Sequence, residues 1–145
     1  MFSRHLLRSI AMQSLYEWDF RHKKVDLQEI LTRNLNNFAD KTLKDNNLAQ
    51  KIVNGVQNNL SQIDLIIQKA APSWPIEKMN ILDRNILRIG VYELIFEKDD
   101  PTPPRAVINE AIELAKSFSS DNSSKFVNGI LATIYQELKE IKYEQ

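Results

Sequence analysis

Residues 81–96 read ILDRNILRIGVYELIF, and this stretch decides the fold class. At helical spacing its apolar side chains cover most sides of the segment and leave few charged positions between them. A helix of this kind needs neighbours on most of its surface. We therefore predict a helix that begins at about residue 76 or 80, ends at residue 96 and lies at the centre of a helical bundle.

Helical periodicity continues on both sides of this segment. Prolines mark two of the boundaries: Pro72 and Pro75 end the preceding helix, and Pro104 fits the first turn of the following one. No segment shows the sustained two-residue alternation that is typical of a strand. The sequence therefore predicts an all-α protein, whose other helices span residues 3–20, 27–39, 48–70, 105–117 and 124–141.

Four small or aromatic residues bear on packing. Gly55, Gly90 and Gly129 fall inside predicted helices, where each costs about 1 kcal/mol relative to alanine. Close approach of two helices explains them most simply, and a local kink is the alternative. Trp74, between two prolines, is expected to pack over the core.

Composition limits the possible functions. The chain has 145 residues, of which 43% are hydrophobic, enough for one domain with a full core. It has no cysteine, which excludes disulfides and thiolate chemistry. Because 19 basic residues balance 19 acidic ones, any RNA binding needs a local basic patch. No signal peptide or membrane-spanning run is evident, so we expect a cytoplasmic protein without a membrane partner.

Motifs for catalysis are absent from the sequence. Three isolated glycines cannot form a phosphate-binding loop, and no serine lies in a nucleophile elbow. The two histidines, His5 and His22, have no acidic partners at metal-ligand spacing. Acidic pairs at helical spacing are typical of solvated helix faces. We therefore predict no enzyme activity, no cofactor and no metal.

Three blocks carry a recognisable pattern. They are SRHLLRSIAMQSLYEWDF at residues 3–20, ILDRNILRIGVYELIF at residues 81–96, and AVINEAIELAKSFSSDNSSKFVNGIL at residues 106–131. The last resembles the C-terminal signature of the NusB family, V-x-x-N-E-A-I-E-L-A-K-x-[FY], then a polar loop, then K-F-V-N-G-[VI]-L. The matches extend over nearly the whole chain.

The resemblance implies a six- to seven-helix NusB-like fold, with two small helical bundles around long central helices, as one RNA-binding domain over residues 1–145. It implies a transcription antitermination factor that binds boxA-type single-stranded RNA of ribosomal RNA operon leaders together with NusE, a small-subunit ribosomal protein. The pair would join the antitermination complex on RNA polymerase. Family members are monomers or homodimers.

The start of the first helix is the first predicted RNA contact. Arg4 and Arg8 are one turn apart on one face, and His5 lies beside them. Arginine suits phosphate because its planar fork donates two parallel hydrogen bonds. The family's start usually has more basic residues, whereas His5 and Leu6 stand at often-basic places here. A solvated helix end is the alternative interpretation.

The loop that enters the last helix is the second predicted RNA contact. Free N–H groups at a helix start can meet a phosphate, Lys125 adds charge, and Asn122 adds a polar side chain. Phe126 could stack on a base or belong to the core, and the sequence leaves both open.

The face at the start of the central helix is the predicted contact with NusE. Its polar residues are Asp83, Arg84 and Arg88. An acid is electrostatically suited to a basic ribosomal protein. The two arginines could instead pair with acids on neighbouring helices.

Two other functions remain open at this stage. One is a helical module that acts mainly by protein–protein interaction, which the neutral charge favours. The other is an RNA-binding accessory domain of an rRNA methyltransferase. We expect no fused methyltransferase, because no glycine-rich cofactor loop or parallel-sheet pattern follows.

Overall fold

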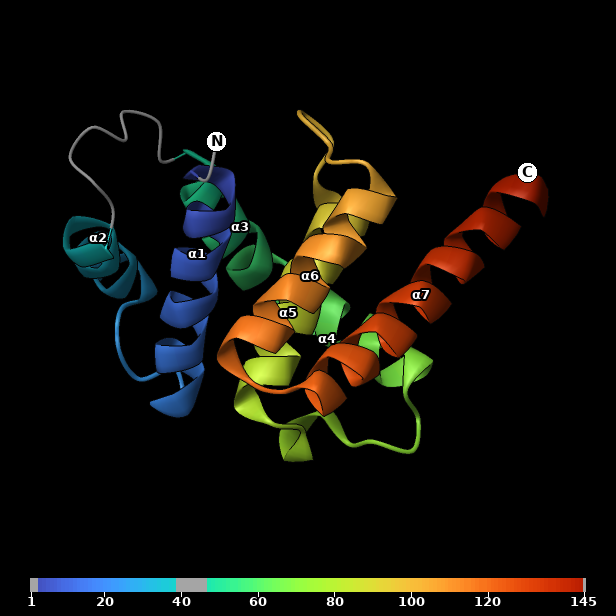
Figure 1. The fold of residues 1–145 in the computed structure, drawn as a ribbon, viewed down its shortest axis with the longest axis horizontal. Helices are drawn as coiled ribbons and strands as arrows, with labels where there is room; N and C mark the ends of the chain where they lie inside the picture. The colour runs from blue at the N-terminus through green and yellow to red at the C-terminus, as the bar shows by residue number, and fades with distance from the viewer. Residues whose placement is uncertain (1–2, 39–46, 145) are drawn as a thin grey trace. The chain divides into compact units, whose positions relative to one another are not determined.

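The computed structural model describes residues 3–38 and 47–144, and every regular element in these ranges is a helix. The fold is all-α, as predicted (Figure 1). The predicted end of the second helix at Ala39 lies outside the described residues. The α-helices are α1 (Ser3–Phe20), α2 (Leu27–Phe38), α3 (Asn47–Asn58), α4 (Leu60–Ala70), α5 (Ile81–Val91), α6 (Pro104–Phe118) and α7 (Asp121–Glu144).

The first compact unit is Met1–Asn58. In it α1 packs against both α2 and α3. The apolar stripe predicted for α1 forms the centre of this packing, since Ile10, Ala11 and Leu15 are fully buried. Leu31 of α2 and Ile52 of α3 are buried as well.

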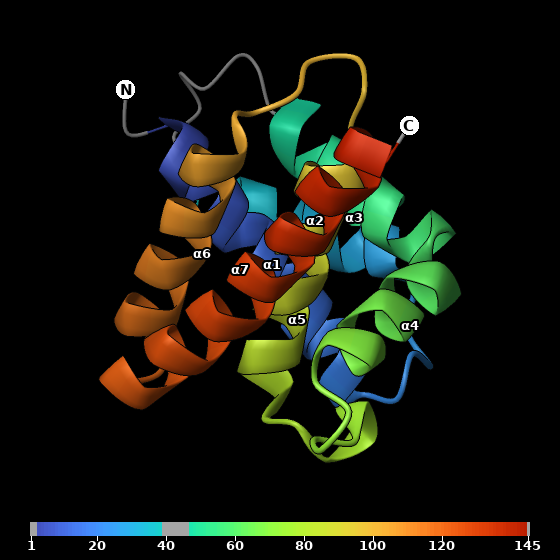
Figure 2. The ribbon, with the colours of Figure 1, turned by 90° about the vertical axis from the view of Figure 1, so that its right-hand side faces the viewer.

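The second compact unit is Asn59–Gln145, and α5 is its central helix. It contacts α4, α6 and α7, and nearly all of its residues are buried, which confirms the predicted central position (Figures 1 and 2). A 3₁₀ turn, η1 (Ile76–Lys78), precedes it, and a π-helical segment, η2 (Tyr92–Phe96), follows it. The side chain of Asn80 caps α5 by accepting the N–H groups of Leu82 at 2.8 Å and Asp83 at 3.4 Å.

Two predicted boundaries are wrong. The helix expected over residues 48–70 is broken at Asn59, whose φ of −120° and ψ of 21° leave the helical region. The last helix begins at Asp121, three residues earlier than expected. Its start is stabilised by Ser120, whose hydroxyl oxygen accepts the N–H of Ser123 at 3.1 Å.

Close packing explains one glycine and not another. A Cβ on Gly90 would lie 2.8 Å and 2.9 Å from the two methyl carbons of Leu131, so α5 and α7 approach too closely there for a side chain. A Cβ on Gly129 would meet nothing within 4 Å, so the prediction of close approach is wrong at that position. Trp74 is 59% exposed, so the prediction that it packs over the core is also wrong.

Within the described residues, no helix has both the length and the hydrophobicity that a bilayer-spanning segment needs. The prediction that residues 1–145 act as a single domain stays a prediction.

Candidate functional site

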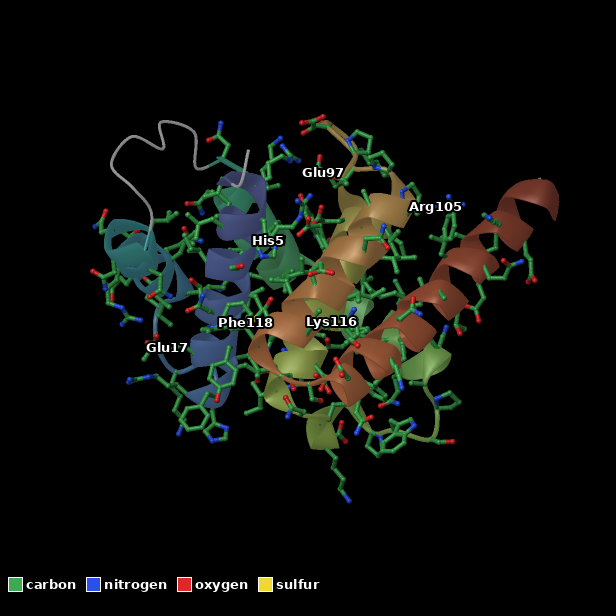
Figure 3. The ribbon with its side chains drawn as sticks, viewed as in Figure 1. His5, Glu17, Glu97, Arg105, Lys116 and Phe118 are labelled. Atoms are coloured by element: carbon green, nitrogen blue, oxygen red, sulfur yellow. The ribbon has the colours of Figure 1, made fainter. Side chains whose placement is uncertain are left out.

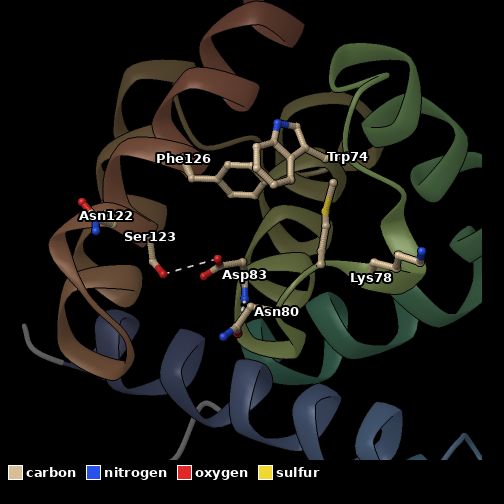
Figure 4. Close-up of a pocket in the computed structure, with 8 residues that line it drawn as sticks. Trp74, Lys78, Asn80, Asp83, Asn122, Ser123 and Phe126 are labelled. Atoms are coloured by element: carbon tan, nitrogen blue, oxygen red, sulfur yellow. Dashed lines mark hydrogen bonds between the residues drawn. The ribbon is translucent and has the colours of Figure 1, made fainter.

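A cavity of about 360 Å³ opens in the second unit where the segment preceding α5 meets the first turns of α7 (Figure 4). From the first segment and the start of α5 come Trp74, Lys78, Met79, Asn80 and Asp83, and from α7 come Asn122, Ser123 and Phe126. The prolines before η1 and the Asn80 cap position the segment that leads into α5, and the Ser120 cap positions the start of α7. We call this cavity the Asp83 pocket.

Two aromatic rings lie at the edge of the Asp83 pocket. The ring of Trp74 meets that of Phe126 edge to face, with centroids 5.6 Å apart and planes inclined by 80°. Phe126 is half-buried, so it belongs neither wholly to the core nor wholly to the surface. Both rings also line a second cavity of about 420 Å³, to which Lys125 contributes. The aromatic pair therefore stands between two hollows.

Asp83 is the buried charged group of the pocket, with 8% of its surface exposed. One carboxylate oxygen, Oδ2, accepts the hydroxyl of Ser123 at 3.3 Å. The other, Oδ1, is buried and has no hydrogen-bond partner among the described residues. Burial raises the pKa of this carboxyl, and the Ser123 hydrogen bond partly opposes that rise. The pocket thus contains an acceptor that the described chain does not satisfy.

The remaining polar groups of the pocket are amides and an amine. The amide oxygen of Asn80 is engaged with the helix start, so its amide nitrogen is the group it can offer as a donor. Asn122 and Lys78 are exposed. The pocket can therefore accept and donate hydrogen bonds beside an aromatic surface.

The predicted RNA contacts on α1 differ in how exposed they are. Arg4 is exposed and His5 is half-buried near the start of the helix (Figure 3). Arg8 is only 3% exposed, so the prediction that Arg4 and Arg8 share one exposed basic face is wrong. Arg8 lies beside Leu7 and one turn from Ala11, which are both buried, whereas Arg4 lies in the first turn of α1.

The three residues predicted to contact NusE do not form an exposed face. Arg88 is 3% exposed, and its guanidinium binds both carboxylate oxygens of Asp64, at 2.8 Å and 3.0 Å. Arg84 donates to the carbonyl oxygens of Ile76 at 3.3 Å and Glu77 at 3.2 Å, and so braces η1. Asp83 lies in the pocket with Asn122 and Phe126, which we predicted as RNA contacts. The pairing of Arg88 with a neighbouring acid, left open by the sequence, is confirmed.

Sequence reasoning missed Trp74, Lys78, Asn80 and Ser123 as pocket residues. The position of Trp74 could have indicated an exposed ring. A tryptophan between two prolines lies outside any helical stripe, so periodicity does not imply that it is buried. Ser123 and Asp83 are 40 positions apart, and only the packing of α5 against α7 brings them together. Among the described residues, no group of three or more His, Cys, Asp or Glu side chains is placed to hold a metal ion.

These features define an all-α protein of two helical units, with an aromatic and polar pocket at the start of its central helix. The NusB family profile matches residues 5–136, and the chain belongs to the NusB family. This family consists of transcription antitermination proteins and not of enzymes, which confirms the prediction of no enzyme activity.

Individual relatives agree with this assignment. The transcription antitermination protein NusB of Roseiflexus castenholzii is 39% identical over 137 residues, which cover 94% of each chain. The structure of T. maritima NusB is 39% identical, with a TM-score of 0.81 over 92% of this chain and 91% of that one. A crystal structure of the antitermination factors NusB and NusE in complex with dsRNA contains a chain that is 31% identical, with a TM-score of 0.81 over 94% of this chain and 98% of that one.

Proposed function

We propose that this protein binds boxA-type RNA of ribosomal RNA operon leaders together with NusE, and so promotes processive transcription by RNA polymerase in the cytoplasm. Its task is recognition, carried out by surface groups that bind a flexible single strand. Part of that recognition takes place in the second unit at Asn122, Lys125 and Phe126, and part on α1 at Arg4 and His5.

The observation that carries the proposal is the aromatic pair beside polar and cationic groups. Single-stranded RNA is bound by stacking its bases on aromatic rings while cations meet its phosphates. Trp74 and Phe126 supply the rings, and the exposed Lys125 supplies a cation in the adjoining cavity. The relative in complex with NusE and dsRNA supports NusE and RNA as partners, and the preference for a single strand rests on the aromatic pair.

The test is fluorescence anisotropy with a short, labelled boxA-type RNA, with and without NusE, over a series of salt concentrations. Two to four phosphate contacts on a single strand give a log–log salt slope of about −1.4 to −2.8. A duplex RNA of equal length serves as the second probe. We expect tighter binding to the single strand and a further gain when NusE is present.

Lys125→Ala is the variant that locates the binding in the second unit. It should reduce the salt slope by about 0.7, the contribution of one phosphate contact. Lys139→Ala is the matched control, because Lys139 is exposed on the same helix about 21 Å further along its axis.

Failure to bind either RNA, while NusE is still captured, would contradict the proposal. That outcome would favour the protein–protein interaction module. The burial of Arg8 supports this alternative in one respect, since it leaves fewer exposed cations on α1.

A further inference from the structure

We propose that the Asp83 pocket receives one unpaired RNA base, stacked on Trp74 and read by Asp83 through an N–H group on the base edge. This inference rests on the proposed function and adds to it a binding place for one base and a specificity-determining residue, Asp83. It also moves Asp83 from the predicted NusE contact to the RNA site.

The indole of Trp74 offers an exposed surface on which a base can stack. Most large aromatic side chains are buried, yet Trp74 is 59% exposed although an edge-to-face contact with Phe126 holds it in place. A ring that is fixed and open needs little ordering when a base stacks on it. The cavity of about 360 Å³ beside it exceeds the volume of a single nucleobase, so the base has room to enter.

The carboxylate of Asp83 has one oxygen without a hydrogen-bond partner among the described residues. Buried polar atoms nearly always have hydrogen-bond partners, and each exception needs an explanation. Asp83 Oδ1 is such an exception, and it belongs to a residue that lines the cavity. Carboxylates accept hydrogen bonds from amino groups on base edges, as with N4 of cytosine. The amide nitrogen of Asn80 adds a donor for a carbonyl or ring nitrogen of the same base.

Charge selects a nucleotide over a cationic side chain from a partner protein. Among the described residues, Asp83 is the only acid that lines the pocket, and Lys78 lines it too (Figure 4). Lys125 lines the cavity on the other side of the aromatic pair. An incoming Arg or Lys would meet these two ammonium groups, whereas a nucleotide brings phosphates that they attract.

The first experiment measures anisotropy of the labelled boxA-type RNA with full-length variants. Trp74→Ala should weaken binding about tenfold, the loss typical of one stacked base, while Trp74→Phe keeps most of the affinity. Leu65→Ala is the matched control, because Leu65 is 56% exposed in the same unit and lies outside both cavities. It should leave the affinity unchanged.

The second experiment identifies the base edge. Each base of the probe that carries an exocyclic amine is replaced in turn by an analogue without it: inosine for guanosine, purine riboside for adenosine, uridine for cytidine. With the wild-type protein, one position should lose at least about tenfold in affinity, a loss typical of a single hydrogen bond to a charged group. With Asp83→Asn, the same replacement should cost nothing more.

The outcomes separate this inference from the function on which it rests. If the wild-type protein binds neither RNA, both are overturned. If it binds RNA while Trp74→Ala and Asp83→Asn match it at every position, the base pocket is overturned and the RNA-binding function stands. If Asp83→Asn weakens only the capture of NusE, the pocket takes a cationic side chain of the partner and the inference is overturned. Because Trp74 is exposed, its variant tests the pocket even if Asp83→Asn does not fold.

Discussion

Arg88 and Asp83 are two buried charged residues less than two turns apart on α5, and they differ in how completely they are hydrogen-bonded. Arg88 is 3% exposed and has its guanidinium bonded to both oxygens of Asp64 and, at 3.0 Å, to the amide oxygen of Asn85. Asp83 is 8% exposed and has one weak contact from Ser123 and one buried oxygen with no described partner.

This difference in hydrogen bonding indicates that Arg88 stabilises the fold, whereas Asp83 is available to bind a ligand. Burying a charge is tolerated when it is paired and hydrogen-bonded, as Arg88 is by Asp64 and Asn85. An incompletely bonded charge is costly, and such residues concentrate at functional sites. The same helix therefore stabilises the second unit at its middle and presents chemistry at its start.

The largest expected effect comes from Arg88→Ala. Removing Arg88 takes away the donors to the Asp64 carboxylate and to the amide oxygen of Asn85, and we expect a loss of about 3 kcal/mol in the free energy of unfolding. Urea denaturation measures it. Arg33→Ala is the control, since Arg33 pairs with Glu17 while half-exposed and should cost less than about 1 kcal/mol. Equal losses in the two variants would show that Arg88 is not the structural charge of α5.

Gly90 and Gly129 also differ in their surroundings: a side chain at Gly90 would meet Leu131, and one at Gly129 would meet nothing. Gly90→Leu should destabilise the protein by about 1–3 kcal/mol through overpacking, because Leu131 is fully buried and has little room to move. Gly129→Ala should stabilise it by about 0.5–1 kcal/mol, because alanine is the better helix former and its Cβ meets nothing. Melting curves measure both, and a melting temperature for Gly90→Leu equal to that of the wild type would contradict the close crossing of α5 and α7.

Periodicity predicted what depends on local spacing. It placed α1, α5 and α6 and the central position of α5, because apolar side chains at three- and four-residue steps must face a core. It missed the break at Asn59 and the early start of α7. Asn59 leaves the helical region without interrupting the apolar spacing on either side, and the early start depends on a serine cap.

The site was predictable only in part. The family signature pointed to Asn122, Lys125 and Phe126, and the structure places all three at the two cavities. Charge type suggested that Arg8 and Arg88 were surface residues, but burial depends on partners that no single-sequence pattern reveals. Trp74 and Asp83 join the site through contacts with α7, about 40 to 50 positions away in the chain.

The pH dependence of the stability of Asp83→Asn tests whether the buried charge of Asp83 destabilises the protein. A buried acid with a raised pKa binds its proton more tightly when folded than when unfolded, so its contribution to stability is lost as pH rises through the raised value. Above the raised pKa the ionised Asp83 therefore costs stability. The variant should melt about 2 °C above the wild type, a small shift for a chain of this size. The gain should shrink as the pH falls, because protonation of Asp83 removes the buried charge.

Thermal melts from pH 4 to pH 7 test this prediction. A structural role at the start of α5, where an acid favours the helix dipole, predicts the reverse: a lower melting temperature for Asp83→Asn at pH 7. A gain in stability together with a loss of base preference is the signature of a residue kept for binding.

The smallest expected effect extends the comparison to α1, where Arg4 is exposed and Arg8 is buried. Arg4→Ala should leave the melting temperature unchanged and reduce the salt slope of RNA binding by about 0.7, as expected for one lost phosphate contact. Arg8→Ala should lower the melting temperature, because it removes a buried charge from its partners. Arg105→Ala is the control for Arg4, since Arg105 is exposed at the start of α6 (Figure 3). If the slope is unchanged for Arg4→Ala, α1 does not contact RNA, and the RNA site is confined to the second unit.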